Sequence, residues 1–582
     1  MITIRPFLLI ALAITGLLTA GCEGTQAPSA DLILHNANIY TVDETKPWAE
    51  AVAIKNGDIV YVGNNEGVKQ WVGEYTQQQN LNGKMLLPGF IDSHAHVVMG
   101  GAYVRSLSLD TYATPEVWLK QIKHFAEQNP DVPHLLGYGF LSSAFGPEGP
   151  SAKMLDTVVS DRPIFIWDEG FHGGWVNTKA MQLLNITSTT PDPASGFSYY
   201  KRDSDGNPSG YLLEVTANMA VAELNLITSE SIALGASDII KIMNSYGITS
   251  MFDASAHAFE KHLFATMDQL VEQQQMTIRF AGSIFFDAEK TLTELINEVK
   301  QAARYTKNKP YKIATVKIMN DGTVEGKTAG VFEAYQGEPH NKGETVFSQQ
   351  QMNTMITALS KENIDIHVHA LGDRAIYETL NAIELAKQKY PDSKTGFTIC
   401  HVQLITDEDI ARMAKLGVIA QSTPLWASYD EYGKAFVSAE QFSRFFRYNS
   451  LKTAGVALSF GSDYPSTGAG TLGMSPLFNI EIGHTRQNAG DKTGAIQPNK
   501  NERLDLASLI HGYTLGGAIQ LKMQDSIGSI SVGKKADFVV LDKNLFESDI
   551  YNIHKIKVLQ TILGGATVYQ NIERSRPDYP VQ

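Results

Sequence analysis

Two histidines alternate in the run Pro88-Gly89-Phe90-Ile91-Asp92-Ser93-His94-Ala95-His96. Because side chains at i and i+2 of a β-strand face the same side, His94 and His96 can reach one metal ion. A lone H-x-H is weak evidence. Further metal-capable groups follow in order, however, each at the end of its own apolar run: Lys317, His369, His401 and Asp463. The ordered set predicts a metal centre built from several strand ends.

The strands that must carry these groups alternate with amphipathic segments through the middle of the chain. This alternation is typical of a parallel α/β architecture. Since the metal-capable groups fall at the C-terminal ends of strands, the sequence predicts a (β/α)8 TIM barrel, in which that face carries the active site. The expected strands are Ile164–Trp167, Ile248–Phe252, Ile313–Ile318, Ile364–His369, Phe397–His401, Val418–Gln421 and Val456–Phe460.

Short β-strands with tight turns mark both ends of the chain. Residues 31–86 and 523–582 are therefore expected to form one small composite β-sandwich around a barrel at residues 87–522. The stretch of about residues 100–240 is long for one β/α connection and is rich in Gly, Pro and aromatic residues. It is expected to contain an inserted lid or subdomain.

The first residues are those of an export signal. Arg5 precedes an apolar run, Phe7–Ala20, that is short for a membrane span. The run ends in Leu18-Thr19-Ala20-Gly21-Cys22, which resembles a lipoprotein box. Residues 1–21 are thus predicted to be a signal peptide, with a lipid on Cys22 and a tether at 22–30. A plain signal peptide is the alternative. Either way the protein is expected to be exported, and a lipid would anchor it facing the periplasm or cell exterior.

Net charge and cysteine content limit the binding partners and the disulfides that can be expected. The formal charge is −14 and no basic stripe is present, which argues against nucleic acid as a partner. After Cys22 the only other cysteine is Cys400, so no internal disulfide is expected if Cys22 carries a lipid. Membrane attachment is expected only through that lipid. The sequence leaves a homo-oligomer open.

Several segments together resemble the amidohydrolase superfamily. The Pro88–His96 run looks like its first-strand motif, and Gly528–Asp537 like its closing signature. Within the superfamily the chain is most similar to the YtcJ-like group, amidohydrolase family 3, which includes N-substituted formamide deformylase. The segments that carry this likeness are Val316–Thr323, His369–Ala375, His401–Ile405, Gly461–Pro465, His172–Asn177 and Gly206–Gly210.

The resemblance implies a centre of two divalent metal ions, zinc being the expected metal. Its ligands would be His94, His96, Lys317, His369, His401 and Asp463. Lys317 in an apolar strand would ordinarily be a snorkelling or paired cation. In binuclear members of the family such a lysine is carboxylated by CO₂ and bridges the two ions. Asp463 is expected to be the catalytic proton acceptor and donor beside a metal-activated hydroxide.

Four further side chains bear on the metal centre or on substrate contact. His367 shares the strand face of His369 and is expected to lie one layer deeper in the barrel than His369. Cys400 precedes His401, so strand alternation predicts that it packs outward. A Cys400 thiolate ligand is the alternative, since thiolate suits zinc. In the Gly-rich run Gly170–Trp175, His172 and Trp175 are the candidates for substrate contact, although a loop histidine or a core aromatic is as ordinary there.

The sequence therefore predicts a hydrolase of a non-peptide C–N bond in a small amide, an N-substituted formamide or a cyclic amide. The alternatives are an esterase or lactonase with the same centre, and a catalytically silent barrel that serves as a binding module. The retained ligand set favours an enzyme.

Overall fold

The core of the protein is an eight-stranded parallel sheet that curls into a barrel. The computed structural model describes residues 29–111, 113–145, 148–171, 173–193, 198–256, 259–286 and 290–571. Neighbouring strands pair in chain order: β8 (Phe90–Ala95), β15 (Ile248–Asp253), β16 (Arg279–Phe285), β17 (Tyr311–Met319), β18 (Asp365–Ala370), β19 (Phe397–His401), β20 (Ile419–Ser422) and β21 (Leu458–Phe460). This confirms the predicted (β/α)8 TIM barrel.

The two end strands are joined where the metal-capable residues lie. The Asp463 backbone N–H, just after β21, donates to the carbonyl of His94 over 2.7 Å. The His96 N–H in turn donates to the carbonyl of Tyr464 over 2.9 Å. These bonds close the barrel and hold the first and last motifs together.

Amphipathic helices surround the barrel. Helix α8 is an example: it begins with a capping box of Thr291 and Glu294 and buries Leu295, Val299 and Ala302 at helical spacing. The helices after the barrel strands include α6 (Ser229–Ser245), α7 (Glu260–Glu272), α8 (Leu292–Tyr305), α9 (Gln349–Lys361), α10 (Asp373–Lys389), α11 (Asp407–Leu416), α14 (Tyr448–Thr453), α15 (Pro476–Thr485), α16 (Leu506–His511) and α17 (Gly517–Gln520).

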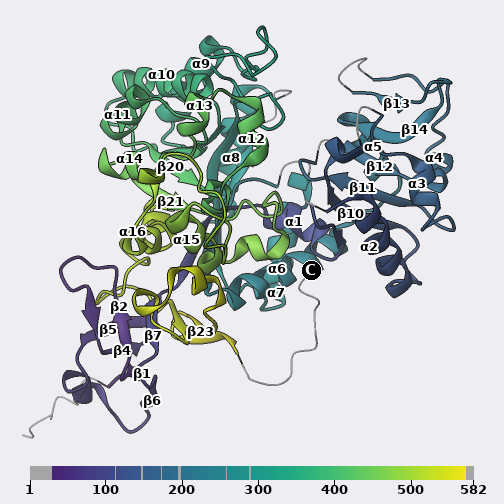
Figure 1. Ribbon diagram of the computed structural model, residues 1–582. Helices are drawn as coiled ribbons and strands as arrows, with labels where there is room; N and C mark the ends of the chain where they lie inside the picture. Colours follow the sequence, from purple (N-terminus) through teal and green to yellow (C-terminus); the bar gives the residue numbers. More distant parts are fainter. Residues whose placement is uncertain are drawn as a thin grey trace, which may run out of the picture.

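Strands from both ends of the chain share one sheet, drawn in purple and yellow in Figure 1. Its six strands are β2 (Asn38–Tyr40), β3 (Trp48–Ala49), β7 (Met85–Pro88), β22 (Phe538–Leu541), β23 (Val558–Leu563) and β24 (Ala566–Gln570). A second sheet contains β1 (Leu32–His35), β4 (Ala51–Lys55), β5 (Asp58–Gly63) and β6 (Gln77–Asn80). Leu34 and Val52 of the second sheet pack with Phe538 and Ile562 of the first in one apolar core.

A separate lobe lies between β8 and β15 and stands apart on the right of Figure 1. It is built on a six-stranded sheet of β9 (Leu107–Ser108), β10 (Leu135–Phe140), β11 (Ile164–Asp168), β12 (Gly173–Val176), β13 (Tyr200–Arg202) and β14 (Pro208–Leu213). Helices α2 (Pro115–Gln128), α3 (Ala152–Asp156), α4 (Thr178–Leu183) and α5 (Val215–Glu223) belong to the same part of the chain. The expected strand Ile164–Trp167 thus belongs to this inserted lobe, and the barrel strand β16 was absent from the expected set.

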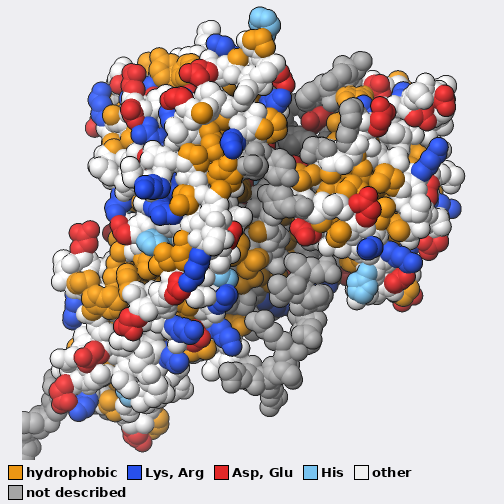
Figure 2. Space-filling model, viewed as in Figure 1, with side chains coloured by type: hydrophobic (Ala, Val, Ile, Leu, Met, Phe, Trp, Pro, Cys, Tyr) orange, Lys and Arg blue, Asp and Glu red, His pale blue; other side chains and the backbone are white. Residues whose placement is uncertain are grey.

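On the face shown in Figure 2, Lys and Arg side chains are interspersed with Asp and Glu. Within the described ranges, no helix has both the length and the apolar character needed to cross a bilayer. The predicted signal peptide and most of the tether precede residue 29 and lie outside the described residues. The predicted domain boundaries and the lipid on Cys22 remain predictions.

Candidate metal centre

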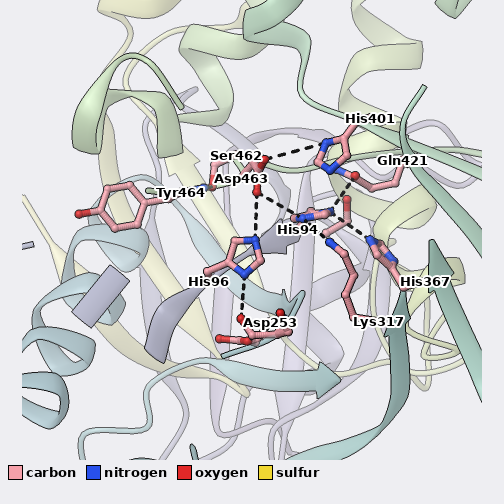
Figure 3. Close-up of polar contacts among 12 residues, drawn as sticks. His94, His96, Asp253, Lys317, His367, His401, Gln421, Ser462, Asp463 and Tyr464 are labelled. Carbon is pink, nitrogen blue, oxygen red and sulfur yellow. Dashed lines mark hydrogen bonds and ion pairs between the residues drawn. The ribbon is translucent and has the colours of Figure 1, made fainter. Parts of the chain in front are cut away.

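His94, His96 and Asp463 converge at the C-terminal end of the barrel (Figure 3). Asp463 Oδ1 lies 3.3 Å from His94 Nε2 and 3.2 Å from His96 Nε2. All three side chains are buried. Their ligand atoms lie within 4.8 Å of one another, a spacing that suits one metal ion. We call this group, with the neighbouring Lys317, His369 and His401, the outer centre.

Hydrogen bonds fix which ring nitrogen each histidine turns toward Asp463. His96 Nδ1 lies 2.8 Å from the carbonyl oxygen of Ser255, which only accepts, so Nδ1 carries the proton. His94 Nδ1 lies 3.0 Å from Gln421 Oε1. The amide nitrogen of Gln421 donates to the Ser422 carbonyl, so its oxygen faces His94. Both histidines therefore present the Nε2 lone pair to Asp463.

Two nitrogen lone pairs that face a carboxylate are repelled by its negative charge, unless a proton or a cation lies between the nitrogens and the carboxylate. Imidazole nitrogen and carboxylate oxygen are the donors that zinc and similar divalent ions accept, and ligating histidines ordinarily donate their other N–H to a carbonyl or carboxylate. The donor set and its outer hydrogen bonds therefore fit a divalent metal ion.

Asp92 ties the two ends of the centre together. Its carboxylate accepts from the Ser462 hydroxyl at 2.6 Å, the Ser462 N–H at 3.0 Å and the His94 N–H at 3.2 Å. Burial raises its pKa to about 6, and the Ser462 bonds act against that rise. Asp463 itself has a positive φ of 54°, a backbone conformation that turns its side chain back over the barrel. The hydrogen bonds that Asp92 accepts explain why the side chains of His94 and Asp463 meet.

Lys317 on β17 points into the same space. Its Nζ lies 3.3 Å from His94 Nε2, and the residue is 3% exposed. No carboxylate among the described residues lies within ion-pair distance of that amine. A buried ammonium without such a partner is costly, and it would also repel a metal ion held by His94. A bare ammonium at this position therefore conflicts with a metal ion held by His94.

His369 and His401 form the other side of the centre, with ring centroids 4.5 Å apart. His401 Nδ1 is buried, makes no hydrogen bond and faces Asp463 Oδ2 at 3.9 Å. His369 Nε2 lies 3.7 Å from Asp321 Oδ1 and 3.4 Å from the Gly322 carbonyl. The buried nitrogen of His401 without a hydrogen bond is a further atom that suits a metal.

The ionisation of the centre suits metal binding. Burial, then the charge of Lys317, hold the pKa of His94 well below its ordinary value. Burial, then the neighbouring His369, do the same to the pKa of His401. Burial acts to raise the pKa of Asp463, but a proton on His96 Nε2 and positive charge on His401 and Lys317 would outweigh burial and lower that pKa. A metal ion in the same place would act in the same direction. Neutral imidazoles and an ionised carboxylate are the forms that ligate a metal.

Comparison with known proteins agrees with this geometry. A family model described as the amidohydrolase family matches residues 77–569. The chain belongs to this family. It is 26% identical over 547 residues to YtcJ, a provisionally assigned amidohydrolase of Bacillus subtilis, covering 92% of this chain and 99% of that one. It is also 26% identical over 560 residues to the N-substituted formamide deformylase of Arthrobacter pascens, covering 93% and 98%.

A solved structure shares the fold of this chain. An uncharacterised metal-dependent hydrolase from Pyrococcus horikoshii superposes with a TM-score of 0.70 at 21% identity, covering 89% of this chain and 99% of that one, which speaks for the fold. The resemblance to the YtcJ-like group is thus confirmed. The protein is a metal-dependent hydrolase of the class that acts on carbon–nitrogen bonds. The individual ligand roles remain predictions.

Below the outer centre of this amidohydrolase, His367 and Cys400 approach His94. His367 Nε2 lies 3.0 Å from His94 Nδ1, so His367 is one layer deeper, as expected. The expectation for Cys400 was wrong: its sulfur lies within 4.8 Å of ligand atoms of His94 and His367, inside the barrel. His401 has a φ of 76°, which breaks strand alternation and lets both adjacent side chains face inward.

The two candidate substrate contacts have different outcomes. His172 lies outside the described residues. Trp175 lies on β12 and is 0% exposed in the core of the inserted lobe, packed against Phe140 and Phe145. Its indole N–H donates to the Ser151 carbonyl over 2.8 Å. These are the contacts of a core residue and not of a pocket wall.

Sequence reasoning missed three residues that support the amidohydrolase centre: Asp92, Ser255 and Gln421. Asp92 stands two residues before His94, on the same face of the strand, which was a usable signal. Gln421 ends a predicted strand but is an uncommon metal ligand. Ser255 acts through its carbonyl, so its side chain gives no signal.

Proposed function

We propose that this amidohydrolase cleaves the C–N bond of a small amide, an N-substituted formamide or a cyclic amide. The observation that carries the proposal is the pair of histidine Nε2 atoms facing Asp463 Oδ1 at 3.3 and 3.2 Å. The similarity to N-substituted formamide deformylase over nearly the whole chain supports this substrate class.

The proposed centre holds two divalent ions, with zinc as the expected metal. His94, His96, His369, His401 and Asp463 would ligate them, with a carboxylated Lys317 as the bridge. When bound, such ions polarise a substrate carbonyl and lower the pKa of water from about 15.7 towards about 7. Burial of Lys317 without a carboxylate partner supports its modification.

Asp463 moves the proton in this proposal. Its lowered pKa keeps the carboxylate ionised and able to accept a proton from the attacking water. It then returns that proton to the leaving nitrogen as the C–N bond breaks, so that an amine and a carboxylic acid form, as two products from an open-chain amide or as one molecule from a cyclic amide. His94 and His96 stay oriented, because Gln421 Oε1 and the Ser255 carbonyl accept their Nδ1 protons.

The test is elemental analysis of purified protein together with a screen of N-formyl and N-acyl amines. We expect bound zinc or a similar transition metal and hydrolysis of at least one amide class. Hydrolysis confined to esters or lactones would replace the substrate class and keep the centre. A protein that binds no transition metal under metal-replete conditions would remove the proposal and favour a binding module.

We also propose that the mature protein is exported and held at the membrane by a lipid on Cys22. The apolar run Phe7–Ala20, followed by Cys22, supports this location. Cys22→Ser should release the protein from the membrane fraction or stall its processing. Identical fractionation of the variant and the wild type would point to a plain signal peptide instead.

A further inference from the structure

We propose that His94, His367 and Cys400 form a second metal site, one layer deeper in the barrel than the outer centre. We call these three residues the deeper site. They come from β8, β18 and β19, and their ligand atoms lie within 4.8 Å of one another. All three residues are buried, with exposures of 0%, 1% and 0%. The chemistry of an imidazole pair with a thiolate selects a thiophilic divalent ion such as zinc or cadmium.

The two nitrogens of His94 serve the two layers separately. Nε2 faces Asp463 of the outer centre, whereas Nδ1 lies 3.0 Å from His367 Nε2. Zinc–nitrogen bonds of about 2.0–2.1 Å in tetrahedral geometry place two nitrogens roughly 3.3 Å apart. The observed pair therefore needs to separate by only a few tenths of an ångström to hold an ion.

A fourth oxygen is available on the next strand. Gln421 Oε1 lies 3.0 Å from His94 Nδ1, and Gln421 pairs in register with Cys400 across β19 and β20. Three side chains and this oxygen surround the deeper site from four different strands. Two imidazoles, one thiolate and this amide oxygen supply up to four donors, the number that tetrahedral zinc takes.

A cavity leads toward the deeper site from the opposite end of the barrel. It has a volume of about 100 Å³, and its wall includes Asp365, Phe397 and Ile419, which begin or adjoin the starts of their strands. Its wall also includes Phe252 and His367. The cavity therefore reaches His367 from the side opposite the outer centre, and its wall also includes Lys522, which pairs with Asp365.

Lys317 sets a condition on occupancy. Its amine lies 3.3 Å from His94 Nε2 and hydrogen-bonds the Cys400 thiol. An ammonium there opposes a cation in the deeper site, whereas the carboxylated lysine of the proposed function does not. Binding displaces the Cys400 thiol proton and the His94 Nδ1 proton to solvent, and no electron transfer is involved.

The test is a titration of the purified, zinc-loaded protein with cadmium chloride, followed by near-ultraviolet cadmium–thiolate absorption and by bound cadmium per chain. We expect saturable absorption in the wild type. Cys400→Ser should abolish that absorption and bind one cadmium fewer per chain. Cys22→Ser, which removes the only other cysteine, should leave the absorption unchanged.

Two further variants keep the test decisive. His367→Gln should weaken cadmium binding at the deeper site by at least about 10-fold, and it carries the test if Cys400→Ser does not fold. Asp463→Asn should keep the absorption while hydrolysis falls, which separates the deeper site from the proposed function. Absorption that is absent in folded wild-type protein at saturating cadmium, or that persists in Cys400→Ser, overturns the proposal.

Discussion

The outer centre and the core of the inserted lobe both bury polar side chains, but they satisfy them differently. In the inserted lobe, the indole N–H groups of Trp118 and Trp175 donate to the carbonyls of Asp110 and Ser151. The Asn177 amide accepts from the Ala180 N–H and donates to the carbonyls of Val159 and Arg162. In the outer centre, His401 Nδ1 has no hydrogen bond, and two histidine lone pairs face one carboxylate.

The difference distinguishes a polar group that supports a fold from one that awaits a ligand. A buried polar group without a partner is costly, so folds ordinarily supply partners from the chain itself. The three lobe side chains above follow that rule, whereas the buried Trp167 Nε1 of the same lobe has no hydrogen-bond partner among the described residues. In the barrel, His401 Nδ1 does not follow the rule, and it lies at the end where active sites lie in this architecture. A bound metal ion would supply its missing partner.

Removing Lys317 should have the largest effect on the outer centre. Lys317→Ala deletes the proposed bridge, so we expect activity near background and loss of bound metal. Added short carboxylic acids should restore part of both by taking the place of the bridge. Lys312→Ala, at an exposed position on the same strand, is the matched control and should behave as wild type. Full activity and metal content in Lys317→Ala would make Lys317 an ordinary strand lysine.

Asp463→Asn tests the proton transfer. The amide keeps the size of the side chain but cannot accept a proton, so kcat should fall roughly 10²–10⁴-fold. The protein should still fold and bind at least one metal ion, because the histidines supply most of the ligands. Steady-state kinetics and elemental analysis on the same preparation measure both. A wild-type rate would remove Asp463 from the mechanism.

Gln421→Leu tests the outer hydrogen bond of His94. Without the amide oxygen, the His94 Nδ1 proton is no longer held by Gln421, and metal affinity should fall about 10–100-fold. Competition with a chelator measures that affinity. Gln350→Leu, on an exposed position of α9, serves as control. Equal affinities in the two variants would show that Gln421 does not orient His94.

Trp175→Ala should have the smallest effect on activity and a large one on stability. Truncating a buried tryptophan typically costs about 3–5 kcal/mol of unfolding free energy. The kcat of the folded fraction and the bound metal should match wild type, since Trp175 contacts the core of the inserted lobe. Denaturant unfolding measured beside kinetics separates the two quantities. A changed substrate preference in stable Trp175→Ala protein would instead bring Trp175 into the binding site.

The barrel could be predicted from the sequence because its apolar strands end in polar residues that the fold itself does not require. His94, His369 and Asp463 each follow an apolar run, and the structure brings all of them to one end of the sheet. Strand β16 was missed because Arg279–Phe285 ends in no such residue. Ile164–Trp167 was recognised as a strand, but an apolar run does not reveal which sheet it joins.

The rest of the site depends on local backbone geometry and on backbone groups. Strand alternation predicted that Cys400 faces outward, but alternation does not hold at the strand end because His401 has a positive φ. The carbonyl of Ser255 orients His96, although no side-chain pattern reports it. The inward position of Cys400 and the hydrogen bonds of His96 therefore emerge only in three dimensions.

The most direct test of the central claim is a crystal structure of the zinc-loaded protein with anomalous diffraction at the zinc edge. We expect a zinc peak within about 2.0–2.2 Å of both His96 Nε2 and an Asp463 carboxylate oxygen. His94 Nε2 and a carboxylated Lys317 should complete the surroundings of the outer centre. Zinc-replete crystals with no anomalous peak in contact with His96 and Asp463, and with a direct hydrogen bond between those two side chains instead, would contradict it.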